Sequence, residues 1–278
     1  SAHEVGHTIG LAHNFAASSK GRSSVMDYPH PTLSLNNGEV DFTDAYDTKI
    51  GDWDKVSIAY SYSEFKTDED ANLKSILNDA FNNGARFITD QDARPLGSAH
   101  AYAHLWDNGS DVSVELENLL LIRKNAIANF SKDNIKSNQP YSVLEDVFVP
   151  LYFLHRYQTE GVAKVIGGLD YTYAIKDDGN TIVKRIPGKL ERKALASVIK
   201  TLSVEELAIP KKILNLFPPR AFNYGRTRES FKSKTGVAFD PFGAVETASS
   251  MTLGLLLHPE RVTRLVQHKS LDSSQLGL

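Results

Sequence analysis

The chain has 278 residues, of which 41 % are hydrophobic and 23 % charged, and its net charge at neutral pH is −3. At roughly 150 residues per domain this length corresponds to one or two globular domains. The slightly negative net charge leaves no surplus of basic residues for binding nucleic acids or anionic membranes. Cysteine is absent, which excludes disulfides, thiolate catalysis and cysteine-based metal sites.

The first half of the sequence is predicted to contain helices separated by long loops. Apolar residues spaced three to four apart predict helices over residues 1–12, 52–62, 68–83 and 112–130. Gly10 and Gly84 are expected to end the first and third of these. The intervening segments 14–50 and 85–111 lack a sustained period and are predicted to be loops.

The second half is predicted to be helical with one β-hairpin. Strand-like runs over 171–176 and 181–186 flank the turn sequence Asp177-Asp178-Gly179-Asn180. Ser203 and Glu206 have the spacing of a helix capping box. Further helices are predicted over residues 142–159, 190–201, 204–216, 242–257 and 259–267. The predicted fold class is therefore mainly α (α+β), with a small β-hairpin.

The segment from His3 to His13 has the form H-E-x-x-H-x-x-G-x-x-H. On a helix, His3 and His7 project from one face, so both imidazoles can bind one ion. Gly10 can adopt the positive φ at which the chain turns and returns His13 as a third ligand. Three imidazoles leave a fourth position open for water, as in catalytic zinc sites, and Glu4 is placed to act as general base for that water.

The eleven-residue motif is unlikely to occur by chance, since its five fixed positions match in roughly one chain of this length in ten thousand. The alternative is a helix that merely carries surface histidines. The motif therefore predicts one Zn²⁺ bound by His3, His7 and His13, and it predicts hydrolysis of peptide bonds by a zinc-activated water.

This motif resembles that of the metzincin metallopeptidases. Met26, in the sequence Ser-Ser-Val-Met-Asp-Tyr-Pro, fits the Met-turn that follows the zinc motif in those enzymes. The resemblance implies that Met26 forms an apolar floor under the three imidazoles. Tyr28 matches the Met-x-Tyr form of the astacin and serralysin branches, which implies that it approaches the metal and stabilises the tetrahedral intermediate. The alternative for Tyr28 is a packed loop residue.

Other features differ from those branches. Asn14 follows His13 where astacins have Glu, and a long helical region follows the motif. Together with the segments 51–55 and 60–62, this layout is similar to a family of large bacterial zinc-dependent metallopeptidases. The similarity implies that residues 1–65 are the C-terminal half of a metzincin catalytic domain, that is, the C-terminal subdomain of a zincin-like fold. Residues 66–278 would be a mainly helical C-terminal region, and the protein would be secreted, periplasmic or at the cell surface.

The zinc motif begins at residue 3, whereas metzincins carry an N-terminal subdomain before it. No signal peptide and no membrane span are visible in the sequence. We therefore expect that a missing N-terminal part of the same protein completes the site. A helix of about nine residues is marginal by itself, so we expect weak zinc affinity and little or no activity in this fragment.

Several other polar residues are weaker candidates for sites. His100 and His104 repeat the four-residue spacing without a Glu, and are expected to be loop or surface histidines. His30, between two prolines, is a candidate for the wall of the substrate cleft. The segments 90–92 and 107–111 offer oxygen ligands for calcium but lack the EF-hand pattern. Asn108 and Asn129 begin glycosylation sequons, which often occur by chance.

The sequence thus predicts a zinc-dependent endopeptidase whose partners are polypeptide substrates, with neither nucleic acid nor membrane as a partner. The alternative is a helical protein-binding or scaffold module with a non-functional metal site. The intact ligands and base favour the enzyme.

Overall fold

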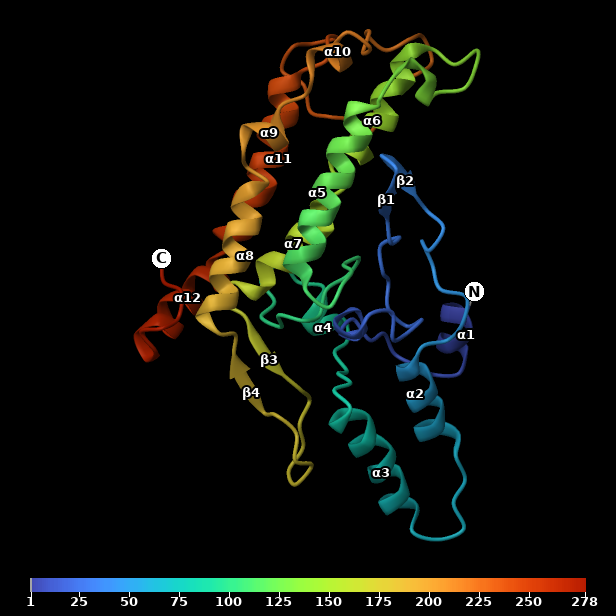
Figure 1. The fold of residues 1–278 in the computed structure, drawn as a ribbon, viewed down its shortest axis with the longest axis vertical. Coiled ribbons are helices and arrows are strands. Elements are labelled where there is room, and N and C mark those ends of the chain that lie inside the picture. Colours follow the sequence, from blue (N-terminus) through green and yellow to red (C-terminus); the bar gives the residue numbers. More distant parts are fainter. Residues whose placement is uncertain (1) are drawn as a thin grey trace.

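The computed structural model describes residues 2–278 and shows an elongated, mainly helical molecule (Figure 1). The two sheets of the described residues have two strands each. The prediction of a mainly α fold with a small β-hairpin is therefore confirmed. No helix in the described part of the chain is long and apolar enough to cross a membrane.

Helices from residue 112 onwards form a bundle that extends in one direction from the middle of the molecule (Figure 1). Its members are α5 (Val112–Ala128), α6 (Leu144–Tyr152), α7 (Arg156–Val165), α8 (Gly188–Lys200) and α11 (Pro241–Leu256). The shorter α9 (Val204–Leu207) and α10 (Lys211–Leu214) lie towards its far end, and α12 (Pro259–Leu271) lies at the opposite end.

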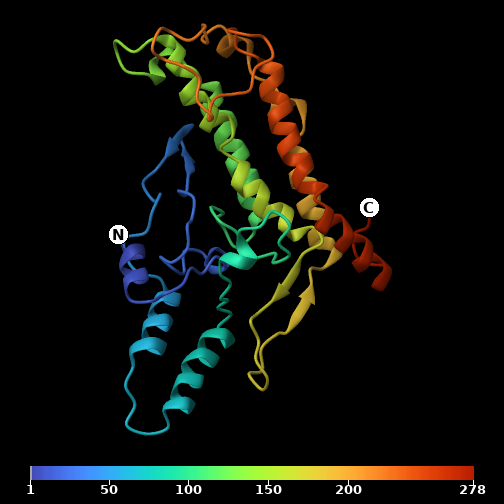
Figure 2. The ribbon, with the colours of Figure 1, turned by 180° about the vertical axis from the view of Figure 1, so that it is seen from behind.

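Three elements extend in the opposite direction from the same middle region, as both views show (Figures 1 and 2). They are α2 (Asp52–Tyr62), α3 (Glu69–Asn82) and the hairpin of β3 (Leu169–Tyr171) and β4 (Val183–Arg185). The first helix, α1 (Ala2–Thr8), lies beside the start of α2. This arrangement places α1 at one side of the molecule, level with the middle region (Figures 1 and 2).

Most helices of the first half begin and end close to their predicted residues. α1 ends at Thr8, just before Gly10 with its φ of 85°, and α2 spans the predicted residues. Gly84 adopts a φ of 80° directly after α3. Local signals were sufficient here because each of these helices is ended by a glycine or begun by a capping side chain.

The prediction that residues 14–50 form only loop is wrong, because β1 (Ser34–Asn36) and β2 (Glu39–Asp41) make an antiparallel hairpin. Its turn residues, Asn37 and Gly38, both have positive φ, of 52° and 84°. Asn-Gly is the preferred sequence of such two-residue turns, so the signal was present in the sequence. The short helix α4 (Asp90–Ala93) likewise interrupts the predicted loop 85–111.

The single helix predicted over residues 142–159 is instead two helices, α6 and α7. Pro150 has no N–H to continue the hydrogen-bond ladder of α6. After α6 the hydrogen bonds span three residues instead of four: Leu154 N donates to the Leu151 carbonyl at 3.2 Å, and Arg156 N donates to the Phe153 carbonyl at 3.0 Å. α7 continues beyond the predicted end, to Val165.

The predicted hairpin around residues 177–180 is present, with Leu169 paired to Arg185 and Tyr171 to Val183. Both strands are shorter than predicted, and the first begins earlier, whereas the second lies within the predicted residues. The Asp178 carboxylate accepts hydrogen bonds from Ile175 N at 2.7 Å and Asn180 N at 2.8 Å. These local bonds compete with the strand ladder and turn the predicted strand ends into a loop.

The capping box predicted at Ser203 is wrong, because Ser203 makes no side-chain cap and Glu206 turns towards the core. Arg123 Nη1 donates to the Glu206 carboxylate at 3.2 Å, and both side chains are buried. The helix predicted over 204–216 is also two short ones, because Pro210 separates α9 from α10.

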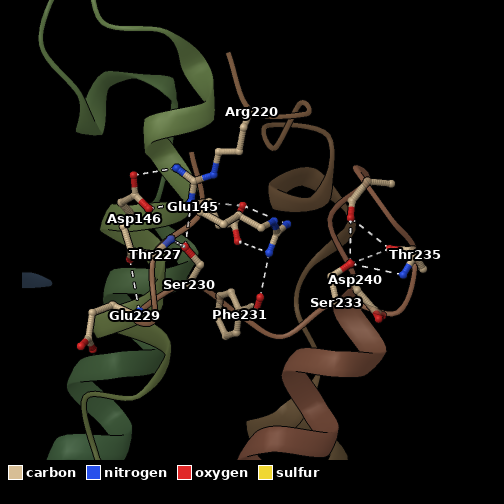
Figure 3. Close-up of polar contacts among 12 residues, drawn as sticks. Glu145, Asp146, Arg220, Thr227, Glu229, Ser230, Phe231, Ser233, Thr235 and Asp240 are labelled. Atoms are coloured by element: carbon tan, nitrogen blue, oxygen red, sulfur yellow. Dashed lines mark hydrogen bonds and ion pairs between the residues drawn. The ribbon is translucent and has the colours of Figure 1, made fainter. Parts of the chain in front are cut away.

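An aromatic cluster forms the core at the far end of the bundle, and the segment 217–240 covers it. Ion pairs hold this segment to α6 (Figure 3). Arg220 donates two hydrogen bonds to Asp146, at 2.6 and 2.7 Å, and Arg226 lies 3.2 Å from the buried Glu145 carboxylate. Arg226 also donates to the Phe231 carbonyl at 2.7 Å. These contacts keep an irregular segment in place over apolar side chains.

The residues before position 65 pack directly against the helical region. Phe15 and Ala16 lie in one buried cluster with Ile88 and Leu105, and Leu33 packs with Leu119 of α5. The hydrophobic contacts that support the zinc motif therefore include side chains from residues 85–122.

We expect the fold to be less stable in acid, because three of its histidines are buried. Burial lowers the pKa of His100 and His104 to about 4 and that of His155 to about 3. The unfolded chain takes up these protons near pH 6.5, so the free energy of unfolding should fall as the pH decreases from about 6.5 to 4. Since one pKa unit corresponds to about 1.4 kcal/mol, we expect a combined loss on the order of several kcal/mol.

Denaturant titrations with a chelator present, at pH 7 and pH 5, measure this loss. Burial raises the pKa of Asp107 to about 7 and that of Asp27 well above its ordinary value, and both shifts stabilise the fold at low pH and offset part of the loss. The variant His155→Phe should show a clearly smaller difference between the two pH values. If His155→Phe and the unmodified protein showed the same difference between the two pH values, the prediction would be contradicted.

Candidate metal centre

The three histidines of the motif converge in space. His3 and His7 lie one helical turn apart on α1, and the chain reverses after Gly10, where Leu11 N donates to the Gly6 carbonyl at 3.0 Å. This reversal returns His13, whose Nε2 lies 3.1 Å from His7 Nε2. One nitrogen from each of the three rings lies within 4.8 Å of the others. Among the described residues, this is the one group of three or more His, Asp or Glu side chains that lie close enough together to bind a metal ion.

Each of the three rings is anchored through its outer nitrogen, Nδ1. For His3 the partner is the Val25 carbonyl at 2.6 Å, and for His7 the Leu11 carbonyl at 3.1 Å. For His13 it is the Asp90 carboxylate at 2.8 Å. An acceptor at Nδ1 fixes the proton there and leaves Nε2 free to bind a metal.

The inner nitrogens face each other without suitable partners. His3 Nε2 is buried and has no hydrogen-bond partner, and the Nε2 atoms of His7 and His13 contact only one another. A buried nitrogen acceptor without a partner is costly unless a cation or proton occupies the site. The side chains therefore fit a Zn²⁺ ion with three imidazole ligands.

Met26 is buried beside α1 and is 1 % exposed. It packs so closely against α1 that a Cβ atom on Gly6 would overlap the Met26 sulfur. Asn14 N donates to the Met26 carbonyl at 3.0 Å, which ties this turn to the segment of the third ligand. Met26 thus packs against the helix that carries His3 and His7, and its role as a floor under the three rings stays a prediction.

The beginning of α2 holds the Met-turn in position. The buried Asp54 carboxylate accepts from Ser24 Oγ at 2.6 Å, Val25 N at 2.9 Å and Gly51 N at 2.6 Å. Ser24 Oγ in turn accepts from Met26 N at 2.9 Å. The Val25 carbonyl held in this way is the acceptor for His3. Asp54 is therefore a positioning residue, which the sequence alone did not indicate.

Asn14 is a second positioning residue, fully buried beside the third ligand. Its side chain donates to the Arg86 carbonyl at 2.8 Å and accepts from Ile88 N at 3.2 Å. These bonds join the loop of His13 to the segment that leads into α4. The carboxylate of Asp90, at the start of α4, is brought to His13 by this connection.

A cleft of about 600 Å³ opens at the N-terminal end of α1. His3, the exposed Glu4 and Tyr28 all line it. The Tyr28 ring centroid is 4.5 Å from that of His3 and 5.1 Å from that of His13. The other lining residues are Val25, Asp27, Pro29, His30, Pro31, Tyr46, Trp106 and Tyr157.

The carboxyl group beside Tyr28 is unusual in its environment. Burial, and then the negative charge of Asp107, raise the pKa of Asp27 well above its ordinary value. Asp27 Oδ1 accepts from Tyr28 N at 2.7 Å, and Trp106 N donates to the Tyr28 carbonyl at 3.0 Å. The backbone of Tyr28 is thus held from both sides.

Asp90 was predicted only as a possible calcium ligand, and its position beside His13 gives it a different role. Burial opposes its ionisation, but hydrogen bonds from Arg94 and His13 outweigh burial and lower the pKa of Asp90 to about 2. Replacing Asp90 with Asn should weaken zinc affinity about 10- to 100-fold, because an amide orients His13 less strongly. Competition titration with a chromophoric chelator measures this.

Asp47→Asn is the matched control, because Asp47 pairs with Arg22 outside the cluster. Its zinc affinity should equal that of the unmodified protein. Equal affinity in the Asp90→Asn and Asp47→Asn variants would contradict a role for Asp90 at the metal.

The other polar residues considered as site candidates make contacts that stabilise the fold. His100 and His104 are buried, not at the surface, and His100 Nε2 bonds to the Tyr171 carbonyl at 2.9 Å. The Asp111 carboxylate caps α5 and pairs with a lysine of α8, and Asn108 is 7 % exposed. His100 and His104 thus lie in the predicted loop 85–111, whereas the alternative of a surface position is wrong, because this loop is buried against the bundle.

Comparison with known proteins adds the family. A family model described as Met-zincin matches residues 1–278. Comparisons with curated proteins and with solved structures gave no match. The match over these residues, together with the geometry of the histidine cluster, shows that the chain belongs to the Met-zincin family.

Proposed function

We propose that the protein is a zinc-dependent endopeptidase, with His3, His7 and His13 as ligands of one Zn²⁺ ion. The single observation that carries this proposal is the convergence of three Nε2 atoms whose rings are each anchored through Nδ1. Membership of the Met-zincin family supports zinc-dependent peptidase activity in general. The substrates of this reaction would be polypeptides that bind in the cleft beside His3.

Glu4 is the general base in this proposal. It is exposed in the cleft next to the first ligand, where its carboxylate can accept a proton from water and deliver it to the leaving amine. When bound, Zn²⁺ supplies Lewis acidity, which lowers the pKa of water to about 7 and polarises the scissile carbonyl. Tyr28 is proposed to donate a hydrogen bond from its hydroxyl to the substrate oxygen, because its ring lies against two of the three ligands.

The complete catalytic unit is proposed to include more polypeptide than this chain. Gly6 is the only residue of α1 that is buried, and Val5 and Ile9 expose 58 % and 36 % of their surface. A seven-residue helix with one buried residue gains little stability from packing. We therefore expect a further segment of the same protein to cover α1 and to strengthen zinc binding.

Metal analysis of the full-length protein tests the proposal against the alternative of a scaffold module. We expect one equivalent of zinc after dialysis, loss of that zinc in His7→Ala, and cleavage of casein by the zinc-loaded protein only. His258→Ala, which removes a histidine at the start of α12, should retain the metal. A full-length protein that binds no zinc and leaves casein intact would favour the scaffold.

A further inference from the structure

A second cavity, of about 440 Å³, adjoins the zinc motif at the other end of α1. It lies between α2, α3 and the loop of the β3–β4 hairpin, the three elements that extend in one direction in Figures 1 and 2. We call it the aromatic pocket, and its main apolar walls are Leu11, Trp53, Tyr60, Phe81, Phe87 and Tyr173. Trp53 stacks on Phe87 with centroids 5.5 Å apart.

The polar groups of the aromatic pocket indicate which ligand fits. Its charged lining residues are one lysine and one aspartate, Lys74 and Asp178, so the pocket carries no net charge. Ser57, Ser61, Asn78 and Asn180 add neutral hydrogen-bonding groups. Apolar walls with a few neutral polar groups suit an aromatic or large aliphatic side chain that is attached to a peptide backbone.

The aromatic pocket adjoins the segment that carries the third metal ligand. Gly10, Leu11 and Ala12 line it, and these three residues connect α1 to His13. The cleft described above contacts the other end of α1, at His3 and Glu4. α1 has seven residues and is therefore about 10 Å long. An extended polypeptide spans this length with about three or four residues.

We infer that the aromatic pocket is a specificity site for the polypeptide substrate, binding an aromatic or large aliphatic side chain three or four residues from the scissile bond. This inference rests on the proposed peptidase function. It assigns a role in substrate selection to α2, α3 and the β3–β4 hairpin, none of which contributes a metal ligand.

The two tryptophans of the chain allow the two cavities to be observed separately. Trp53 lines the aromatic pocket and Trp106 lines the cleft. In the full-length protein carrying Glu4→Gln to prevent turnover, Trp106→Phe leaves Trp53 as the reporter within this chain, and Trp53→Phe leaves Trp106. The probes are ten-residue peptides of Ala and Ser with one Phe at successive positions, the all-Ala/Ser peptide, and N-acetylphenylalanine amide.

We expect Phe-containing peptides to change Trp53 emission, and the all-Ala/Ser peptide and the amide to have far less effect at the same concentration. In the active protein, cleavage should be about tenfold faster for peptides with Phe three or four residues from the cleaved bond. Ser61→Phe, at the exposed rim of the pocket, should remove this preference. Ser75→Phe, the same replacement on an exposed part of α3 outside the pocket, should keep it.

Three results would overturn the inference, and they are distinguishable from one another. A change in Trp106 emission without a change in Trp53 emission would confine the substrate to the cleft and leave the proposed function intact. An equal response of Trp53 to the free amide and to the peptides would make the pocket a small-molecule site. Absence of zinc and of any cleavage would remove the proposed function and this inference together.

Discussion

Glu4→Gln is expected to reduce kcat for peptide hydrolysis by about 10²- to 10⁴-fold while the zinc content stays at one equivalent. Glutamine has nearly the same shape as glutamate but cannot accept the proton of the attacking water. Glu4 is exposed in the cleft and does not bond to any of the three histidine rings, so its replacement leaves the ligands in place. The measurement is the steady-state rate on a quenched fluorescent peptide together with metal analysis of the same sample.

Glu39→Gln provides the matched control, because Glu39 is an exposed glutamate on β2 outside the cleft. Its activity should equal that of the unmodified protein. If Glu4→Gln and Glu39→Gln hydrolyse the peptide at the same rate, Glu4 is not the general base.

Gly6→Ala is expected to destabilise the protein by about 1–3 kcal/mol and to weaken zinc binding. The added Cβ would overlap the sulfur of Met26, which is 1 % exposed. Either α1 or the Met-turn must shift, and each carries or anchors a ligand, since Val25 of the turn bonds to His3. Denaturant unfolding and a zinc titration measure the two effects.

Two comparisons isolate this contact. Gly254→Ala, in α11, adds a methyl group where no atom lies within 4 Å, and it should stabilise the protein by up to about 1 kcal/mol. In a Met26→Ala background, Gly6→Ala should cost much less, because the sulfur is gone. An equal cost of Gly6→Ala in both backgrounds would show that the close packing of Gly6 on Met26 is unimportant.

Local features of the structure were readable from the sequence. The boundaries of α2 and the end of α1 follow from apolar spacing and from Gly10, all within about ten residues of chain. The convergence of His3 and His7 follows from helical geometry, and the return of His13 requires only the turn at Gly10. The hairpin at Asn37 and Gly38 could also have been recognised from its turn sequence.

The support of the site was not readable in this way, because it depends on contacts between distant segments. Asp90 reaches His13 across 77 positions, and Asp54 reaches Ser24 across 30. A buried carboxylate that bonds to backbone N–H groups has no signature in the sequence. The burial of His100 and His104 could not be predicted either, because it depends on how the bundle packs over the loop 85–111.

X-ray absorption spectroscopy of the zinc-loaded full-length protein tests the central claim most directly. The account predicts three nitrogen ligands at about 2.0–2.1 Å with imidazole scattering, and one further light ligand from water. In His13→Ala the number of imidazole ligands should fall to two, or the zinc should be lost. A spectrum with fewer than three imidazoles in the unmodified protein, or one that His13→Ala leaves unchanged, would contradict the account.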